Sequence, residues 1–231
     1  MTDPRIYRQL RFELPPGACE LLLVRHGESE AAVEGVEFAF VDGQGDPELS
    51  ELGRAQAALV CARLAGAGID AIYVTSMRRT GATAAPLAAA LDRHPIVEPD
   101  LREVHLGVWE GGAFRKHVTE GHPIALRMAE EQRYDVIPGA EPAEHFAARV
   151  RAAVERIAAA HPGERVAVFT HGGVIGELLA QATHSDPFAF TGTDNASLSH
   201  LVVTPRRWYL RRFNDTTHLE PALTLQPAPL T

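Results

Sequence analysis

The sequence predicts an α/β fold, a three-layer sandwich in which a mostly parallel central sheet is flanked by helices. Short apolar runs bounded by glycines, typical of buried strands, alternate along the chain with longer Ala- and Leu-rich segments of helical pattern. Such an alternation implies right-handed crossovers that place helices on both faces of a largely parallel sheet. The 231 residues are 45% hydrophobic and suffice for one large domain, with an expected core over about residues 18–215.

The strands and helices are predicted in order along the chain. The predicted buried strands are LLLV (21–24), DAIYVTS (70–76) and ERVAVFT (164–170). Ser50 is a predicted N-cap for the first long helix, in which Leu52, Gln56, Leu59 and Arg63 recur at helical spacings. Further helices are predicted at 78–91, 142–160 and 172–183.

The C-terminal region has a different pattern. Two β-rich runs, LSHLVV and WYLRRFN, are separated by TPRR, which predicts a hairpin or edge pair with Pro205 in the turn. An edge strand at 207–213 would let two copies pair across a two-fold axis, so a homodimer is compatible with the sequence. The proline-containing segment 216–231 is predicted to be an extended tail.

Composition excludes several classes of protein. The formal net charge of −8 argues against a nucleic-acid partner, because phosphate backbones are bound by clustered Lys and Arg. The N-terminus lacks a signal-peptide pattern and no window reaches the ~18 apolar residues of a membrane span, so we expect a cytoplasmic protein without a membrane partner. Cys19 and Cys61 are expected to be free thiols, with Cys61 on the buried face of a helix. The 11 histidines are scattered without metal-ligand spacing, so neither a metal nor another cofactor is expected.

Three strands end in cationic or imidazole side chains. Arg25 and His26 follow the first strand, Arg78 and Arg79 follow the second, and His171 follows the third. In open α/β sheets the carboxyl ends of the strands form the ligand-binding crevice, so these side chains should converge on one ligand. Each of the two histidines is followed by glycine, which lets a backbone N–H approach an oxyanion closely. A phosphate group is the expected ligand, because the arginine fork matches its paired oxygens.

The same residues suggest a phosphoryl-transfer chemistry. A histidine beside two arginines is held neutral, and a neutral imidazole can attack phosphorus to give a phosphohistidine. The departing alkoxide then needs a proton, which a glutamate with a raised pKa could supply. The loop LREVHLGVWEGG offers two candidates, Glu103 and Glu110, between which spacing does not decide.

Several motifs resemble those of one known family. LLLVRHGESE (21–30) is similar to the signature of the histidine phosphatase superfamily, also called the phosphoglycerate mutase-like family, in which a strand ends in Arg-His-Gly-Glu. The further motifs that agree, in order, are LSELGRAQA, VTSMRRTGATAAPLA, LREVHLGVWEG, PGAEPAEHFAARV, VFTHGGVIGELL and NASLSHLVV. Together they span roughly residues 20–205, and the resemblance implies the fold of this family.

The resemblance also implies roles for individual residues. His26 would be the phosphorylated nucleophile and Glu103 the proton donor, because Glu110 falls on a position that is usually structural in the family. The implied phosphate pocket comprises Arg25, Arg79, His171 and the N–H of Gly172. Arg78, next to Arg79, is expected to face solvent.

The chain departs from the family pattern at several positions. Many members have an asparagine that touches the phosphate six residues after the histidine, where this chain has Ala32, so one contact is missing or replaced. Thr75 stands where many relatives have serine, and residues 30–48 do not match the usual mutase pattern. Residues 112–140 are expected to form a helical insertion near the active site. Its Arg127 and Arg133 are expected to make salt bridges on the helix surface.

The preferred interpretation is a metal-independent phosphomonoesterase that hydrolyses a small phosphorylated metabolite through a phosphohistidine. A phosphoglycerate-type mutase is the alternative enzyme, but VHLGVWEG after Glu103 differs from the arginine- and tyrosine-containing segment typical of mutases. A catalytically weak phosphate-binding or interaction protein on the same fold is the alternative of another class, and only Ala32 favours it. The sequence does not identify the substrate.

Overall fold

The computed structural model describes residues 6–219, which form a six-stranded mixed sheet with the strand order β5-β4-β6-β1-β7-β8. The strands are β1 (Cys19–Arg25), β4 (Ala71–Val74), β5 (Ile96–Val97), β6 (Arg165–Thr170), β7 (Leu198–Val203) and β8 (Trp208–Asp215). The first four strands of this order run parallel, whereas β7 and β8 are antiparallel to their neighbours. A separate two-stranded hairpin consists of β2 (Phe40–Val41) and β3 (Gln44–Gly45).

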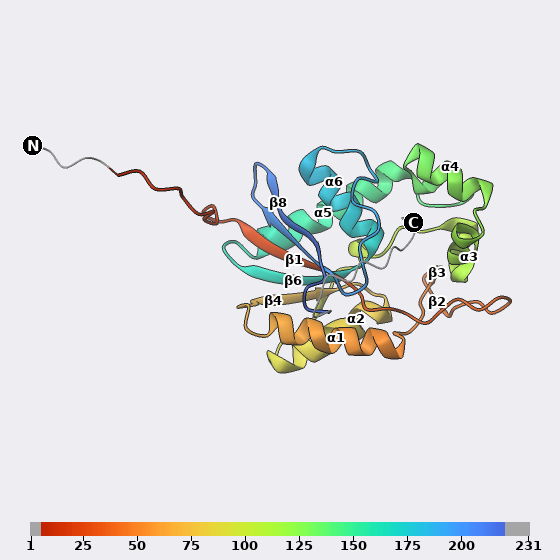
Figure 1. The fold of residues 1–231 in the computed structure, drawn as a ribbon, viewed down its shortest axis with the longest axis horizontal. Coiled ribbons are helices and arrows are strands. Elements are labelled where there is room, and N and C mark those ends of the chain that lie inside the picture. The colour runs from red at the N-terminus through yellow and green to blue at the C-terminus, as the bar shows by residue number, and fades with distance from the viewer. Residues whose placement is uncertain (1–5, 220–231) are drawn as a thin grey trace, which may run out of the picture.

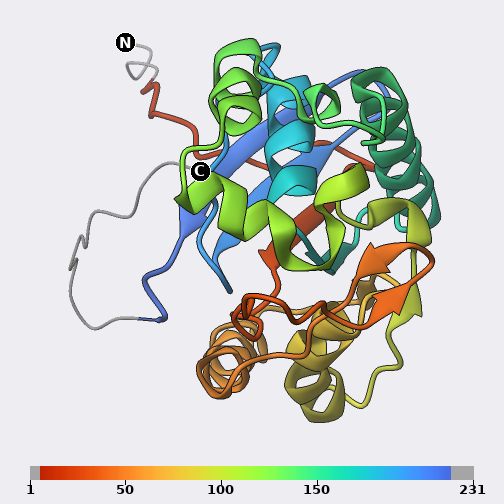
Figure 2. The ribbon, with the colours of Figure 1, turned by 90° about the vertical axis from the view of Figure 1, so that its right-hand side faces the viewer.

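Helices cover both faces of the sheet, so the predicted three-layer α/β sandwich is confirmed (Figure 1). On one face lie α1 (Glu51–Leu64) and α2 (Arg78–Ala90), and on the other lie α5 (Ala143–Ala160) and α6 (Gly172–Thr183). The remaining helices are α3 (Ala113–Thr119), α4 (Pro123–Glu131) and the 3-10 helices η1 (Pro99–Leu101), η2 (Gly107–Gly112) and η3 (Tyr134–Val136). Figure 2, which looks onto the end of the sheet where β1 finishes, shows α3, α4 and the β2–β3 hairpin in front of it.

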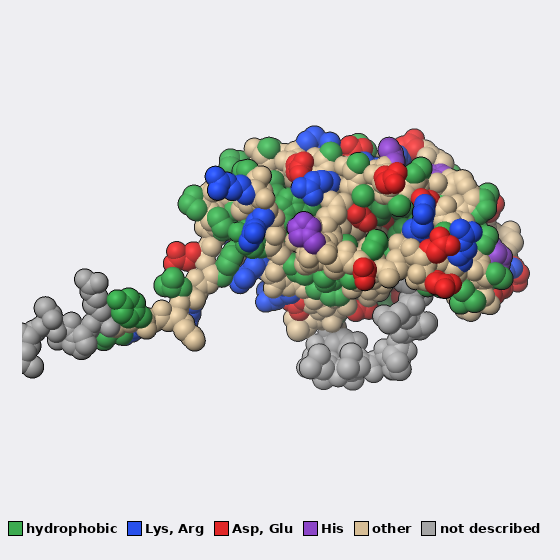
Figure 3. Space-filling model, turned by 90° about the horizontal axis from the view of Figure 1, so that it is seen from above, with side chains coloured by type: hydrophobic (Ala, Val, Ile, Leu, Met, Phe, Trp, Pro, Cys, Tyr) green, Lys and Arg blue, Asp and Glu red, His purple; other side chains and the backbone are tan. Residues whose placement is uncertain are grey.

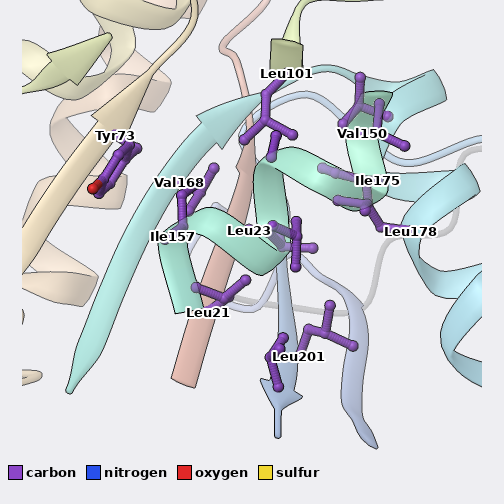
Figure 4. Packing of buried hydrophobic residues seen from close by; sticks show 14 of the residues in the cluster. Leu21, Leu23, Tyr73, Leu101, Val150, Ile157, Val168, Ile175, Leu178 and Leu201 are labelled. Carbon is purple, nitrogen blue, oxygen red and sulfur yellow. The ribbon is translucent and has the colours of Figure 1, made fainter. Parts of the chain in front are cut away.

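Alternation of side chains along the strands builds two cores. Leu21 and Leu23 of β1 are buried with Val150 of α5 and Ile175 of α6 (Figure 4). The intervening residues point to the other face, where they pack against α1 and α2. Because successive side chains of a strand point to opposite faces, a strand covered on both sides reads as a continuous apolar run. This explains the LLLV pattern on which the strand prediction was based.

The first helix begins as predicted, but another of its faces is buried. The Ser50 hydroxyl accepts a hydrogen bond from the Gly53 N–H at 3.0 Å, which is an N-cap. Leu52 and Leu59 are 53% and 40% exposed, and the buried positions of the helix are Gly53, Ala57, Val60 and Leu64. Small residues on this face let α1 approach its neighbours closely, which a pattern of large apolar residues does not reveal.

The two cysteines are free thiols in different environments. Cys19 is fully buried in β1, and burial raises the pKa of its thiol to about 12. The expectation that Cys61 lies on the buried face of α1 is met in part, because its side chain is half-buried and packs against the core under this helix. A position one residue from the fully buried Val60 leaves Cys61 at the margin of the core.

The C-terminal hairpin is present, and β8 forms one edge of the sheet. The predicted tail at 216–231 falls mostly outside the described residues. Residues 6–17 run away from the body at the end of the sheet opposite to α3 (Figure 1). On the face that α5 and α6 cover, Lys and Arg are interspersed with Asp and Glu (Figure 3). Among residues 6–219, no helix has the length and apolar character needed to cross a membrane.

Candidate active site

The carboxyl ends of the central strands bring the predicted residues of the first and third strands together. Arg25 and Thr170 are register partners at the ends of β1 and β6. The residues that follow, His26 and His171, therefore lie side by side, with ring centroids 5.3 Å apart and an interplanar angle of 63°. The backbone N–H of His26 donates to the Thr170 carbonyl oxygen at 3.0 Å, which fixes the backbone directly after β1.

The His26 ring is held in one orientation. Its Nδ1 lies 2.7 Å from the Gly27 carbonyl oxygen, and its side chain is buried. Burial lowers the pKa of His26 well below its ordinary value of 6.5, and the charges of Arg79 and Arg25 lower this pKa further. The imidazole is therefore neutral near neutral pH, which is the form that can act as a nucleophile.

Two arginines face this histidine. Arg25 donates to the Thr193 carbonyl oxygen, while its buried Nε has no hydrogen-bond partner among the described residues. Arg79 is 7% exposed and lies 3.4 Å from a carboxylate oxygen of Asp46. Burial lowers the pKa of both guanidinium groups. A desolvated cation attracts an anion strongly, so this part of the site is suited to phosphate.

The neighbouring Arg78 lies outside this group. It is half-exposed and pairs with Asp46 and Glu48 at 3.0 Å each. Asp46 also accepts a hydrogen bond from the Arg78 backbone N–H, so this carboxylate anchors the start of α2. Asp46 belongs to segment 30–48, in which no pattern predicted a carboxylate that pairs with Arg78 and Arg79.

His171 is fully buried, and one of its two ring nitrogens has a hydrogen-bond partner. Its Nε2 lies 3.1 Å from the Thr75 hydroxyl, and its Nδ1 has no partner among the described residues. Burial and the charge of Arg79 lower the pKa of His171 well below 6.5. Thr75, the departure from serine, thus keeps a hydroxyl that positions the second imidazole.

Glu103 lies in the loop between η1 and η2 and reaches the start of α6. Its Oε2 accepts from the Gly173 N–H and its Oε1 from the Val104 N–H, both at 3.1 Å. A Cβ added at Gly173 would lie 2.5 Å from Glu103 Oε1. The second glycine after His171 therefore makes room for this carboxylate. The first, Gly172, begins α6 beside Arg25.

Glu110 has other partners. Its two oxygens accept from the backbone N–H groups of Gly45 and Leu106, both at 2.8 Å. These bonds tie the β2–β3 hairpin to η2 and occupy both oxygens of the carboxylate. Backbone N–H groups also bond both oxygens of Glu103, so the two carboxylates differ in place: Glu103 contacts the start of α6 beside His171, whereas Glu110 joins the hairpin to η2.

Arg149 of α5 holds the loop that carries Glu103. Its guanidinium donates to the carbonyl oxygens of Asp100, Arg102 and Glu103 at 2.6, 2.8 and 3.0 Å, and pairs with Glu141 at 2.7 Å. Arg149 lies within the motif PGAEPAEHFAARV, but the sequence analysis gave it no function. Only the fold shows which loop it contacts.

A small cavity opens beside Arg79 and Glu103. Its volume is about 100 Å³, and Phe38, Leu106, Trp109 and Phe114 supply aromatic and apolar walls. Arg115 of α3 also lines it. Within residues 6–219, His, Cys, Asp and Glu side chains form no group of three or more suited to hold a metal ion.

Of the two arginines of segment 112–140, Arg127 lies on α4 and Arg133 lies directly before η3. Arg127 pairs with Glu131 within α4, and Arg133 pairs with Asp135. Both arginine side chains are more than half exposed. They make the surface salt bridges that were expected of them.

Comparisons with known proteins agree with this geometry. The sequence pattern of the histidine phosphatase superfamily (branch 1) matches residues 21–216. A metal-independent phosphoserine phosphatase of Arabidopsis thaliana is 32% identical over 211 residues, covering 90% of this chain and 86% of that protein. A probable phosphoglycerate mutase, GpmB, of Photorhabdus laumondii is 32% identical over 216 residues, covering 88% of this chain and 97% of that protein. The structure of a mycobacterial glucosyl-3-phosphoglycerate phosphatase is similar with a TM-score of 0.73 at 28% identity, covering 86% of this chain and 100% of that chain.

Proposed function

The chain belongs to the histidine phosphatase superfamily and acts as a phosphatase, and we propose that it hydrolyses small phosphorylated metabolites through a phosphohistidine on His26, without a metal ion. The observation that carries this proposal is the 2.7 Å contact between His26 Nδ1 and the Gly27 carbonyl oxygen. A carbonyl oxygen only accepts, so Nδ1 bears the proton of the neutral ring. Nε2 then keeps a lone pair for attack on phosphorus.

In the first step Nε2 of His26 forms a bond to phosphorus while the bond from phosphorus to the ester oxygen breaks. The leaving oxygen takes the proton of the Glu103 carboxyl group, which gives the free alcohol. Arg25 and Arg79 stabilise the charge on the equatorial oxygens. If the Thr75 hydroxyl donates to His171 Nε2, then His171 Nδ1 carries a proton for a phosphate oxygen.

In the second step a water molecule attacks the phosphohistidine. The Glu103 carboxylate accepts a proton from this water, the bond between nitrogen and phosphorus breaks, and inorganic phosphate leaves. Neutral His26 and protonated Glu103 are restored. Hydrogen bonds from the Gly173 and Val104 N–H groups hold the carboxylate in place for both proton transfers.

The substrate proposed is a small ester. Phosphoserine is the first compound to assay, because a phosphatase named for it is 32% identical over 90% of this chain. Sugar phosphates and nucleotides are the larger esters against which it is compared.

Transfer of the phosphoryl group to a sugar acid instead of to water is the second candidate reaction. The relative named a probable phosphoglycerate mutase favours it. The test is whether a bisphosphorylated primer raises phosphoglycerate interconversion above the rate of phosphate release. A protein that only binds phosphate would do neither.

The proposed function is tested by phosphate release from an aryl phosphate in the presence of a metal chelator. Native protein is compared with His26→Ala and with His94→Ala, a control at an exposed histidine. We expect chelator-resistant release that is lost only in His26→Ala. Release that the chelator abolishes, or that survives in His26→Ala, would overturn the mechanism.

A further inference from the structure

Arg115 is a third arginine of the site and has no assigned function. It lies on α3, and it donates to the Glu30 carbonyl oxygen and the Ser29 hydroxyl, both at 2.7 Å. Its guanidinium carbon lies 5.2 Å from the centre of the Phe38 ring. These contacts direct the guanidinium toward the loop that follows His26.

The charge of Arg115 is attracted by the Glu28 carboxylate, which lies beyond ion-pair distance. Among residues 6–219, no carboxylate forms an ion pair with it, whereas Arg78 and Arg79 both pair with Asp46. Neighbouring atoms that partly desolvate the guanidinium lower the pKa of Arg115, and the charge of Arg25 lowers it further, although the residue as a whole is exposed. An anion that binds between these two like charges would be attracted by both.

Arg115 lies close to the reacting histidine. Its charge is one of those that lower the pKa of His26, and Arg115 lines the same cavity as Arg79 and Glu103. Its bonds to Ser29 and to Glu30 each use one N–H. The remaining donors of the five N–H groups of a guanidinium are available to a ligand.

The departure at Ala32 lies at the same place. A Cβ added at Gly112, the residue before α3, would lie 3.1 Å from the Ala32 Cβ, so α3 starts against the methyl group of Ala32. Arg115 follows three residues later, one helical turn into α3. Ala32 cannot donate a hydrogen bond, but Arg115 can donate from the same wall of the site.

We propose that Arg115 binds the phosphoryl group in the active site and supplies from α3 the contact that Ala32 cannot make. The guanidinium would form charge-assisted hydrogen bonds to a phosphate oxygen beside Arg25 and Arg79. This inference rests on the proposed function, because it concerns the group that His26 attacks.

The test is binding of inorganic phosphate, measured by titration calorimetry, to native protein and to Arg115→Ala and Arg115→Gln. Charge-assisted hydrogen bonds of this kind should make the Kd at least about 10-fold higher in both variants. The control is Lys116→Ala, which removes the same charge from the next residue of α3, where it pairs with Glu34 on the surface; its Kd should stay within about two-fold of the native value. A Kd within about two-fold of native in both Arg115 variants would overturn the inference.

A double-mutant cycle with Ala32→Asn tests whether the two positions share one contact. Ala32→Asn should lower the Kd for phosphate several-fold in Arg115→Ala and change it little in the native protein. An equal effect in both backgrounds would show that Arg115 does not replace a contact at Ala32. Thermal melts of every variant identify those that fail to fold.

Phosphate binding and phosphate release are read out separately, which distinguishes this inference from the proposed function. Binding that depends on Arg115 in a protein that releases no phosphate would overturn the function alone. Release that depends on His26, together with binding that is indifferent to Arg115, would overturn the inference alone.

Discussion

Gly173 offers a direct test of the acid, because any side chain there must displace the Glu103 carboxylate. In Gly173→Ala the new Cβ would lie 2.5 Å from Glu103 Oε1 and 3.4 Å from the Tyr134 hydroxyl. Carbon and oxygen in close contact are normally about 3.3–3.6 Å apart, so the carboxylate must move by about 1 Å. The atom displaced is the end of a flexible side chain, so the backbone need not move.

The expected effect is on the rate and not on the fold. A misplacement of about 1 Å can cost about 100-fold in rate, so kcat of Gly173→Ala should fall by about that factor. Alanine is favoured over glycine within helices by about 0.5–1 kcal/mol, which offsets part of the strain. The free energy of unfolding should therefore stay within about 1 kcal/mol of the native value.

The assay compares kcat for an alkyl phosphate with kcat for 4-nitrophenyl phosphate. Nitrophenolate leaves with little protonation, so a displaced acid should slow the alkyl ester more than the aryl ester. The control is Gly81→Ala within α2, where an added Cβ would meet no atom within 4 Å. An unchanged kcat, or an equal loss on both esters, would refute the assignment of Glu103 as the acid that Gly173 accommodates.

Three further outcomes are expected. Because burial and two arginines hold the pKa of His26 well below 6.5, kcat/KM should not decline as the pH falls from 7 to 6; an acid limb near pH 6.5 would contradict this. Arg149→Ala removes the arginine partner of Glu141, whose side chain is 8% exposed and keeps His145 and the His105 N–H as partners, and should lower the free energy of unfolding in urea by about 3 kcal/mol; the exposed Arg151→Ala should change it by less than about 1 kcal/mol. His171 also has a lowered pKa, so below about pH 6.5 the unfolded chain binds a proton at this residue that the folded chain does not. The free energy of unfolding should therefore decrease as the pH is lowered below about 6.5, and it should decrease less steeply in His171→Asn.

The fold and the strand ends were predictable because they depend on local patterns. Apolar runs of strand length mark the buried sheet, and the carboxyl ends of its strands mark the site, so the positions of His26 and His171 follow from periodicity and topology. The choice of Glu103 over Glu110 required the family resemblance. The structure adds a difference in place, since the Glu103 carboxylate contacts the start of α6 next to His171, whereas Glu110 ties the β2–β3 hairpin to η2.

Other parts of the site were not predictable because they depend on contacts between distant segments. Arg149 binds carbonyl oxygens of a loop more than 45 residues earlier, and Arg115 contacts Ser29 across 86 residues. Sequence spacing does not encode such pairs. The buried face of α1 was missed for another reason, because Gly53 and Ala57 bring helices together by their small size.

The central claim is that His26 carries the phosphoryl group, and trapping that intermediate tests it most directly. Native protein and His26→Asn are mixed with labelled aryl phosphate, quenched in alkali because phosphohistidine is acid-labile, and digested for mass spectrometry. The account predicts label on the peptide that contains His26, formed at least as fast as phosphate is released and absent from His26→Asn. Phosphate release by the native protein without label at His26, or label that persists in His26→Asn, would contradict it.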